Sequence, residues 1–227
     1  MKYLIQFEKT GLLRYISHLD LMRLFQRTFK RAELKLEYSK GFNPHPKISI
    51  AQPLSLGYTS EEEYLEFETG ENYEPDSMAA YLNTLFPEGI SIRQCRRMED
   101  LKKNAAASVR YGRYEIFWRT EPLENGAALL KRFLGQAEIL AEKPQKKTKK
   151  LKEIDIRPMI YSAEYEGNCG GKECFSLVLA TGSESNLNPE LFMQAFCRFA
   201  ERSFLKEAFR IHRKGLYLEN GKSLINM

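Results

Sequence analysis

Two histidines and an aspartate near the start of the chain are residue types suited to proton transfer. His18 and Asp20 lie in the run Ser-His-Leu-Asp, and His45 lies between two prolines in the run Asn-Pro-His-Pro. Histidine changes charge near neutral pH and can act as a general acid or base in phosphodiester cleavage. One hypothesis is therefore a metal-independent endoribonuclease with His18 or His45 as the catalytic group. The structural alternative, which we favour, has His18 bonded to backbone at a helix start and His45 solvated.

A helix must position the first of these residues. Ser17 can cap a helix that is expected to continue to about Leu34, because its hydroxyl can accept an orphan backbone N–H and Asp20 suits the positive helix end. The expected buried stripe is Leu21, Met22, Phe25, Phe29 and Ala32. A second row on the helix, at four-residue steps, consists of Arg23, Arg27 and Arg31, with Lys30 beside it. Like charges at such steps repel in an isolated helix, so this row costs free energy unless an anion or buried carboxylates lie opposite.

A second basic cluster lies at residues 143–152, where six of ten residues are lysine. They include Lys146, Lys147, Lys149 and Lys150. Lysine runs attract polyanions because phosphate contacts release counterions. Aromatic side chains for base stacking are available in Tyr15, Tyr38 and Phe42, so single-stranded or looped RNA fits better than duplex DNA. The alternative is a solvated loop that only aids solubility.

The loop at residues 40–47, Lys-Gly-Phe-Asn-Pro-His-Pro-Lys, is expected to be rigid and exposed. Each proline fixes its own φ and restricts the residue before it, here Asn43 and His45. Lys40 and Lys47 bracket the loop with positive charge. Rigid loops on a scaffold often carry function, although these prolines could simply turn the chain.

The four cysteines predict no cofactor or metal centre. Cys169 and Cys174 could supply half of a zinc site, but zinc needs four ligands, and the Gly-Gly between them is typical of a hairpin turn. The sequence has no phosphate-binding loop, no dinucleotide fingerprint and no cysteine triplet for an iron–sulfur cluster. The irregular cysteine spacing fits a reducing compartment, and neither a signal peptide nor a membrane-spanning run is recognised, so a cytoplasmic location is expected.

Periodicity predicts an α+β protein with two tandem ferredoxin-like (βαββαβ) domains. The first, residues 1–100, has strands at 2–8, 36–39, 62–68 and 90–93 and helices from Ser17 and Pro75. The second, residues 110–227, has a strand at 114–118, a hairpin of 152–165 with 174–180, a strand at 209–212 and a tail hairpin at 215–224. Its helices are expected at 127–134 and after Asn188-Pro189, where an asparagine cap and a first-turn proline coincide.

The same residues also carry a family resemblance. The run Arg14-Tyr-Ile-Ser-His18-Leu-Asp20-Leu-Met-Arg23, then Gly41-Phe-Asn-Pro-His45-Pro-Lys47, then Pro53-Leu-Ser-Leu-Gly57 resembles the radical-SAM-linked domain of unknown function. Ile154-Asp155-Ile-Arg157-Pro158 is similar to that family's second signature. The resemblance implies a stand-alone member that acts beside a separate radical SAM enzyme. A weaker similarity, in architecture and in the early histidine, is to the RAMP-type proteins that process CRISPR RNA.

Three functions follow as hypotheses. The first is an accessory protein that binds RNA, such as tRNA or rRNA, or presents a substrate to a radical SAM partner. The second is the endoribonuclease, and the third is a protein-interaction adaptor without nucleic acid. Residues expected to bind RNA or substrate are Arg14, His18, Asp20, Arg23, Arg27, Lys30, Arg31, Lys40, Asn43, His45, Lys47, Lys146, Lys147, Lys149, Lys150, Asp155 and Arg157.

Overall fold

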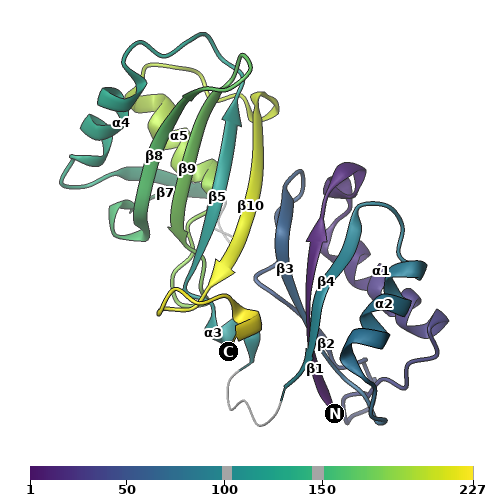
Figure 1. Ribbon diagram of the computed structural model, residues 1–227. Helices are drawn as coiled ribbons and strands as arrows, with labels where there is room; N and C mark the ends of the chain where they lie inside the picture. Colours follow the sequence, from purple (N-terminus) through teal and green to yellow (C-terminus); the bar gives the residue numbers. More distant parts are fainter. Residues whose placement is uncertain (99–103, 145–150, 227) are drawn as a thin grey trace. The chain divides into compact units, whose positions relative to one another are not determined.

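A computed structural model describes residues 1–98, 104–144 and 151–226 of the chain, with the side chain of residue 144 left out. The chain divides into two compact units (Figure 1). Unit 1 comprises Met1–Val109 together with Arg213–Met227, and unit 2 comprises Arg110–His212. The expected second domain, 110–227, therefore differs from unit 2 at its end, because the last stretch of chain returns to unit 1.

Unit 1 runs strand, helix, strand, strand, helix, strand. Its elements are β1 (Lys2–Lys9), α1 (His18–Arg31), β2 (Ile48–Ala51), β3 (Thr59–Glu68), α2 (Pro75–Leu85) and β4 (Ile90–Arg97). A short 3-10 helix, Gly11–Tyr15, lies between β1 and α1. Strand β1 is antiparallel to both β3 and β4, and β2 pairs with β3 on the side away from β1.

One face of this sheet packs against α1 and α2 (Figure 1). Alternation in β1 turns Tyr3, Ile5 and Phe7 toward the helices, and the α1 stripe supplies Phe25 and Phe29. The rings of Phe7 and Phe25 meet edge to face with centroids 4.9 Å apart, a preferred aromatic geometry. The predicted buried stripe of α1 is confirmed at its centre, while Met22 and Ala32 are only partly buried.

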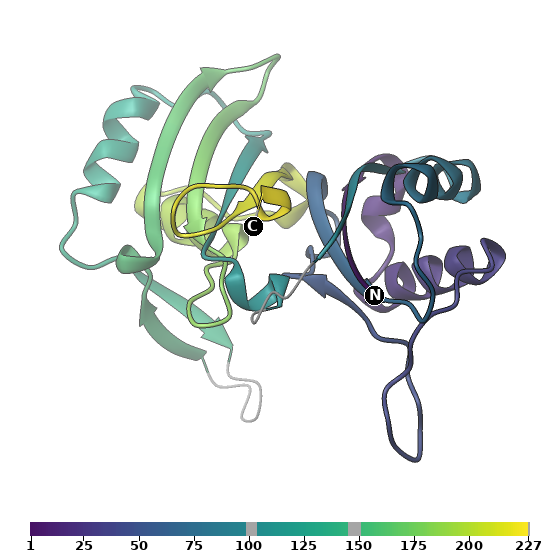
Figure 2. The ribbon, with the colours of Figure 1, turned by 60° about the horizontal axis from the view of Figure 1, so that its bottom comes forward.

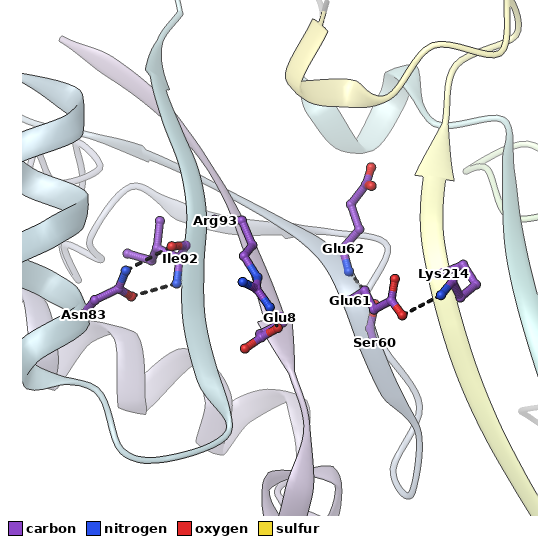
Figure 3. A network of polar contacts seen from close by, with 8 residues as sticks. All are labelled: Glu8, Ser60, Glu61, Glu62, Asn83, Ile92, Arg93 and Lys214. Carbon is purple, nitrogen blue, oxygen red and sulfur yellow. Dashed lines mark hydrogen bonds and ion pairs between the residues drawn. The ribbon is translucent and has the colours of Figure 1, made fainter.

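The other face of the unit 1 sheet packs against the short helix α3 (Ala105–Ser108) and the end of the chain. Leu4 and Tyr64 from the sheet meet Val109, Leu216 and Leu224 in one buried cluster. The part of β10 (Phe209–Tyr217) that belongs to unit 1 lies beside β3, where the Lys214 ammonium is 2.5 Å from a Glu61 carboxylate oxygen (Figure 3). The C-terminal segment is therefore part of the unit 1 core.

Side-chain hydrogen bonds and an ion pair also hold the outer strand β4. The Asn83 side chain of α2 both donates to and accepts from the backbone of Ile92, at 2.9 and 2.7 Å (Figure 3). This amide takes the place of a strand partner and covers one position of an exposed sheet edge. Next to it, Arg93 forms an ion pair with Glu8 of β1.

Unit 2 has its own sheet and helices. Its elements are β5 (Tyr111–Trp118), α4 (Gly126–Leu134), β6 (Leu140–Pro144), β7 (Leu151–Asp155), β8 (Ile160–Asn168), β9 (Glu173–Ala180), α5 (Pro189–Phe199) and the first half of β10. Strand β9 lies between β5 and β8, antiparallel to both, and β10 borders β5. Strands β6 and β7 form a separate hairpin.

Aromatic side chains fill the unit 2 core. The Phe133 ring of α4 contacts the rings of Phe192 and Phe196 on α5, with centroids 5.6 and 5.4 Å apart. Phe175 of β9 continues the cluster through Phe196. Gly126 lets α4 approach β8, since a Cβ at this position would lie 2.6 Å from the Tyr165 ring.

The α+β class predicted from periodicity is confirmed, and several helix starts match their signals. Three element predictions are wrong. Helix α1 ends at Arg31 rather than near Leu34, because Glu33 adopts φ +58° and the Leu34 N–H donates to the Phe29 carbonyl, which closes the helix end. The expected strand at 36–39 is reduced to isolated bridges.

The third wrong prediction is the long strand at 152–165. Residues 151–155 pair with β6 instead, and a 3-10 turn at Arg157–Met159 separates them from β8. Pro158 lacks the N–H that a continuous ladder needs, and Asp155 accepts the backbone N–H of Arg157, which favours the turn. Among the described residues, no helix has the length and apolarity to cross a membrane.

Candidate functional site

The start of α1 is organised by local hydrogen bonds. The Ser17 hydroxyl accepts the Asp20 backbone N–H at 3.2 Å and donates to the Asp20 carboxylate at 2.6 Å. Arg23 donates to the other oxygen of Asp20 at 2.9 Å. The Ser17 hydrogen bond, followed by that of Arg23, lowers the pKa of Asp20 below its ordinary value. Asp20 is therefore a capping residue held in its ionised form, and His18 lies exposed at the first position of the helix.

Buried charges hold the segment that leads into this helix. The Arg213 guanidinium pairs with the Glu63 carboxylate, at 2.7 Å from Nε to Oε1, and both side chains are almost fully buried. The same guanidinium donates to the Gln52 carbonyl at 2.7 Å. The Lys9 ammonium, also buried, donates to the Ile16 carbonyl at 3.3 Å. Burial lowers the pKa of Lys9, and neighbouring Glu63 partly opposes that effect.

These contacts join two parts of the first signature. Ile16 lies in the run that contains Arg14, and Gln52 immediately precedes the Pro-Leu-Ser-Leu-Gly run. The Gly57 N–H closes the connection by donating to the Arg14 carbonyl at 2.8 Å. The Arg14 guanidinium lies over the Tyr15 ring, 5.1 Å from its centroid. Segments that are far apart in the sequence therefore form one support around the start of α1.

The basic row of α1 borders two hollows on the surface of unit 1. The larger has a volume of about 770 Å³ and is lined by Gln26, Arg27, Lys30, Glu33, Leu34, Lys35, Leu36, Tyr38 and Pro46. The smaller has a volume of about 380 Å³ and is lined by Leu13, Ile16, Asp20, Arg23, Leu24, Arg27 and Pro87. Arg27 lines both, and we call the two hollows together the α1 groove.

The α1 groove combines cations with apolar and aromatic surface. Its four lining cations, Arg23, Arg27, Lys30 and Lys35, face two acids, Asp20 and Glu33. Asp20 is already bound to Arg23. Tyr38 presents an exposed ring within the larger hollow. Cations beside an exposed aromatic ring suit the backbone and the bases of a single-stranded nucleic acid.

Besides Arg23, two expected cations of unit 1 have partners. Arg31 donates to the Leu85 carbonyl at the end of α2, at 3.3 Å. The Lys47 ammonium lies 2.6 Å from the Glu68 carboxylate, and that hydrogen bond raises the pKa of Lys47. Both side chains therefore contribute to the structure of unit 1 as well as to its charge.

The proline loop lies away from the start of α1. Residues 38–46 project from unit 1 as a narrow loop, seen at the bottom of Figure 2, with Tyr38 bridged to Pro46. The Ser39 side chain accepts the His45 backbone N–H at 3.0 Å. Lys40, Asn43 and His45 are all exposed in this loop.

The structure does not bring the two histidines together. Ile48, which follows the proline loop, pairs with Phe67 opposite Tyr3 at the beginning of β1. The segment before His18 instead lies against Lys9, at the end of β1. Six strand residues separate these positions by roughly 20 Å. His18 and Asp20 are therefore not brought together with Asn43 and His45 in one pocket, because the two segments lie at opposite ends of β1.

The second signature has a structural role in unit 2. One oxygen of Asp155 accepts the backbone N–H groups of Ile139 and Arg157, both at 2.9 Å. Arg157 donates from Nε to the Leu134 carbonyl at 3.0 Å, at the end of α4. These bonds fix the turn between β7 and β8. Lys146, Lys147, Lys149 and Lys150 lie outside the described residues.

Several residues of the site were not predicted from the sequence. Lys35 lines the α1 groove, although it follows the helix and lies off the four-residue row. The site is supported from three different strands by Lys9, Glu63 and Arg213. In the sequence, only the presence of a charged residue within an alternating strand indicated that these positions could be special. Among the described residues, no group of three or more His, Cys, Asp or Glu is placed to hold a metal ion.

The fold and site thus define an α+β protein with a basic, partly apolar groove along one helix. A family model described as "Uncharacterized protein conserved in bacteria (DUF2344)" matches residues 2–189. The chain belongs to this family. No curated protein matches the sequence. Among solved structures, a chain from "Crystal Structure of a Cbf5-Nop10-Gar1 Complex" is similar with a TM-score of 0.49 and 10% identity, over 96% of this chain. This chain spans 50% of the length of that one.

Proposed function

We propose that the protein binds single-stranded or looped RNA along the α1 groove. The observation that carries the proposal is the placement of Arg23, Arg27 and Lys30 along two hollows that share Arg27, with the exposed Tyr38 ring in the larger one. Phosphates can bind the cations while a base stacks on the ring. The proposed role is that of an accessory protein that presents RNA, such as tRNA or rRNA, or another substrate to a radical SAM enzyme.

We also propose that both units have the ferredoxin-like fold. Unit 1 has the spatial strand order β4-β1-β3-β2, and unit 2 has β10-β5-β9-β8. The first strand of each sheet along the chain, β1 or β5, is therefore internal. The second strand of the sheet, β2 or β8, lies at the edge beside the third, β3 or β9. Each unit also has one helix after its first strand and another after its third.

The binding proposal is tested with a fluorescent single-stranded RNA over a series of salt concentrations. Affinity is expected to fall as salt rises, with each lost phosphate contact reducing the slope of log affinity against log salt by roughly 0.7. Arg27→Ala should therefore weaken binding and flatten the slope. Arg198→Ala, which removes an arginine from a groove of unit 2, is the matched control and should bind like the wild type.

Two results would contradict the proposal. The first is binding that does not change with salt, and the second is an equal loss in Arg27→Ala and Arg198→Ala. A duplex DNA of the same length is the competitor that tests the preference for single strands. It should displace the RNA only at higher concentration.

For the endoribonuclease hypothesis, the segments of His18 and His45 lie at opposite ends of β1, so only one of the two histidines could act on a given phosphate. Cleavage of RNA in EDTA that disappears in His18→Ala but persists in His45→Ala would still establish a one-histidine enzyme. We expect no cleavage that depends on either histidine.

An adaptor that binds a protein without nucleic acid is favoured by one observation. Four large apolar side chains within or close to the first and third signature runs are more than half exposed: Leu12, Tyr15, Leu19 and Leu56. Such surface is typical of a protein contact. Co-purification of a radical SAM enzyme that is lost in Leu12→Ser with Leu19→Ser, while no RNA is recovered, would support the adaptor in place of the RNA-binding protein.

A further inference from the structure

Two cysteine thiols flank the turn between β8 and β9 in unit 2. The register pairs Asn168 with Glu173, and the Cys169 N–H donates to the Lys172 carbonyl at 2.8 Å. Cys169 thus lies opposite Lys172, two positions before Cys174. Because side chains alternate along a strand, Cys169 and Cys174 project from the same face of the hairpin.

The thiols are close, and they differ in exposure. Cys169 is close enough to Cys174 to contribute to the raised pKa of its thiol. Cys169 is exposed at the turn, whereas Cys174 is only 4% exposed, which decides which sulfur a reagent can reach first. Burial raises the pKa of Cys174 to about 12, so its thiol stays protonated at neutral pH.

The turn holds the thiols together and leaves them room to adjust. Gly170 and Gly171 have φ angles of +62° and +79°, in the left-handed region that hairpin turns of two residues favour. Asn168 fixes both sides, since its side chain accepts the Gly171 N–H at 3.0 Å and donates to Glu173 at 2.8 Å. Tyr165 donates to the same buried carboxylate. The turn is therefore anchored at its base and adaptable at its tip.

We propose that Cys169 and Cys174 form a thiol–disulfide exchange site for low-molecular-weight disulfides such as oxidised glutathione. The Cys169 thiolate attacks one sulfur of the small disulfide, which forms a mixed disulfide and releases one small thiolate. Cys174 transfers its proton to that thiolate and attacks the Cys169 sulfur, which releases the second small molecule as a thiolate. This thiolate takes up from solvent the proton that Cys169 lost on ionisation. Two protein thiols are oxidised to one disulfide, and the small disulfide is reduced to two thiols.

The disulfide is expected to be easy to reduce. Side chains that are diagonal across a hairpin have Cβ atoms farther apart than an unstrained disulfide prefers. Closing the bond therefore shifts the Gly-Gly turn, and strained disulfides are the labile ones. A closed zinc site is a poorer fit for the same thiols. It needs four ligands, and the part of the chain that the structure describes offers no group of three.

The test is incubation of the full chain with oxidised glutathione, acid quenching, alkylation and peptide mass spectrometry. The wild type should yield a peptide cross-linked between Cys169 and Cys174 that dithiothreitol reverses. Cys174→Ser and Cys174→Ala should both stop at a glutathione adduct on Cys169. Cys169→Ser should leave Cys174 unmodified. Cys95 and Cys197 are buried internal controls, so they should stay reduced in every variant.

Three outcomes would overturn the proposal. One is an unreactive Cys169, and another is a stable glutathione adduct on Cys169 of the wild type without the cross-link. The third is modification of Cys174 in Cys169→Ser as fast as that of Cys169 in Cys174→Ser. Because Cys169 is exposed, its serine variant should fold normally, which circular dichroism checks.

Discussion

Each unit has helices and a sheet of its own, but the helix surfaces of the two units differ in charge. The α1 groove of unit 1 is lined by four cations and two acids. The corresponding hollow beside α4 and α5 in unit 2, about 360 Å³ in volume, contains one cation, Arg198, and two acids, Glu138 and Glu153. The excess of cations over acids is therefore found beside α1 in unit 1 and not in the hollow of unit 2, which is why the proposed RNA binding is assigned to unit 1.

The interiors of the two units also differ in the charge that they bury. The unit 2 core is built from packed aromatic rings, and its buried carboxylate, Glu173, accepts hydrogen bonds from the neutral side chains of Tyr165 and Asn168. Unit 1 instead buries an ion pair, Arg213 with Glu63, next to the ammonium of Lys9. Buried ions are costly to place, so their position directly behind the signature segments indicates that these segments need a fixed conformation.

The largest effect is expected from Glu63→Ala. It leaves the Arg213 guanidinium buried without its carboxylate, which costs about 3–5 kcal/mol of unfolding free energy. Urea denaturation gives the value. Glu61→Ala, which removes the partly exposed partner of Lys214 on the same strand, is the control and should cost less than about 1 kcal/mol. Equal losses in the two variants would remove the distinction between the buried and surface pairs.

A smaller effect is expected from Lys9→Met, measured as a dependence on pH. The folded-state pKa of Lys9 lies below its unfolded value, so between the two pKa values the unfolded chain binds more protons. Lys9 therefore makes the wild type gain stability as pH rises toward its ordinary pKa of 10.5. The methionine variant should lose this part of the slope in urea denaturation between pH 8 and pH 10. An unchanged slope would show that burial does not perturb Lys9.

The smallest effect is expected from Ser17→Ala, which removes the α1 cap and should cost about 1 kcal/mol. The pKa of Asp20 should also rise toward its ordinary value, because the Ser17 hydrogen bond is the main cause of its lowering. The stability that Asp20 contributes is present above its unfolded pKa and is lost as pH falls through the folded pKa. Carboxylate titration by NMR measures the shift, and Ser17→Gly should cost only a few tenths of a kcal/mol.

Local signals in the sequence predicted much of the secondary structure. The serine cap and apolar stripe of α1, the proline start of α2, and the Asn188-Pro189 start of α5 all depend on residues within a few positions of each other. Caps and helical periodicity act over one or two turns, so a single sequence contains the whole signal. The basic row along α1 was visible for the same reason.

The sequence by itself therefore determined the α+β class, most helix starts and the charge of one helix. Tertiary structure decided which residues meet. Glu63 and Arg213 are 150 residues apart, and only the placement of β10 beside β3 makes them a pair. His18 and His45 are closer in sequence, yet β1 holds their segments at opposite ends. Sequence separation does not measure distance in a sheet, because strand register, set by the packing of the whole unit, decides which positions face each other.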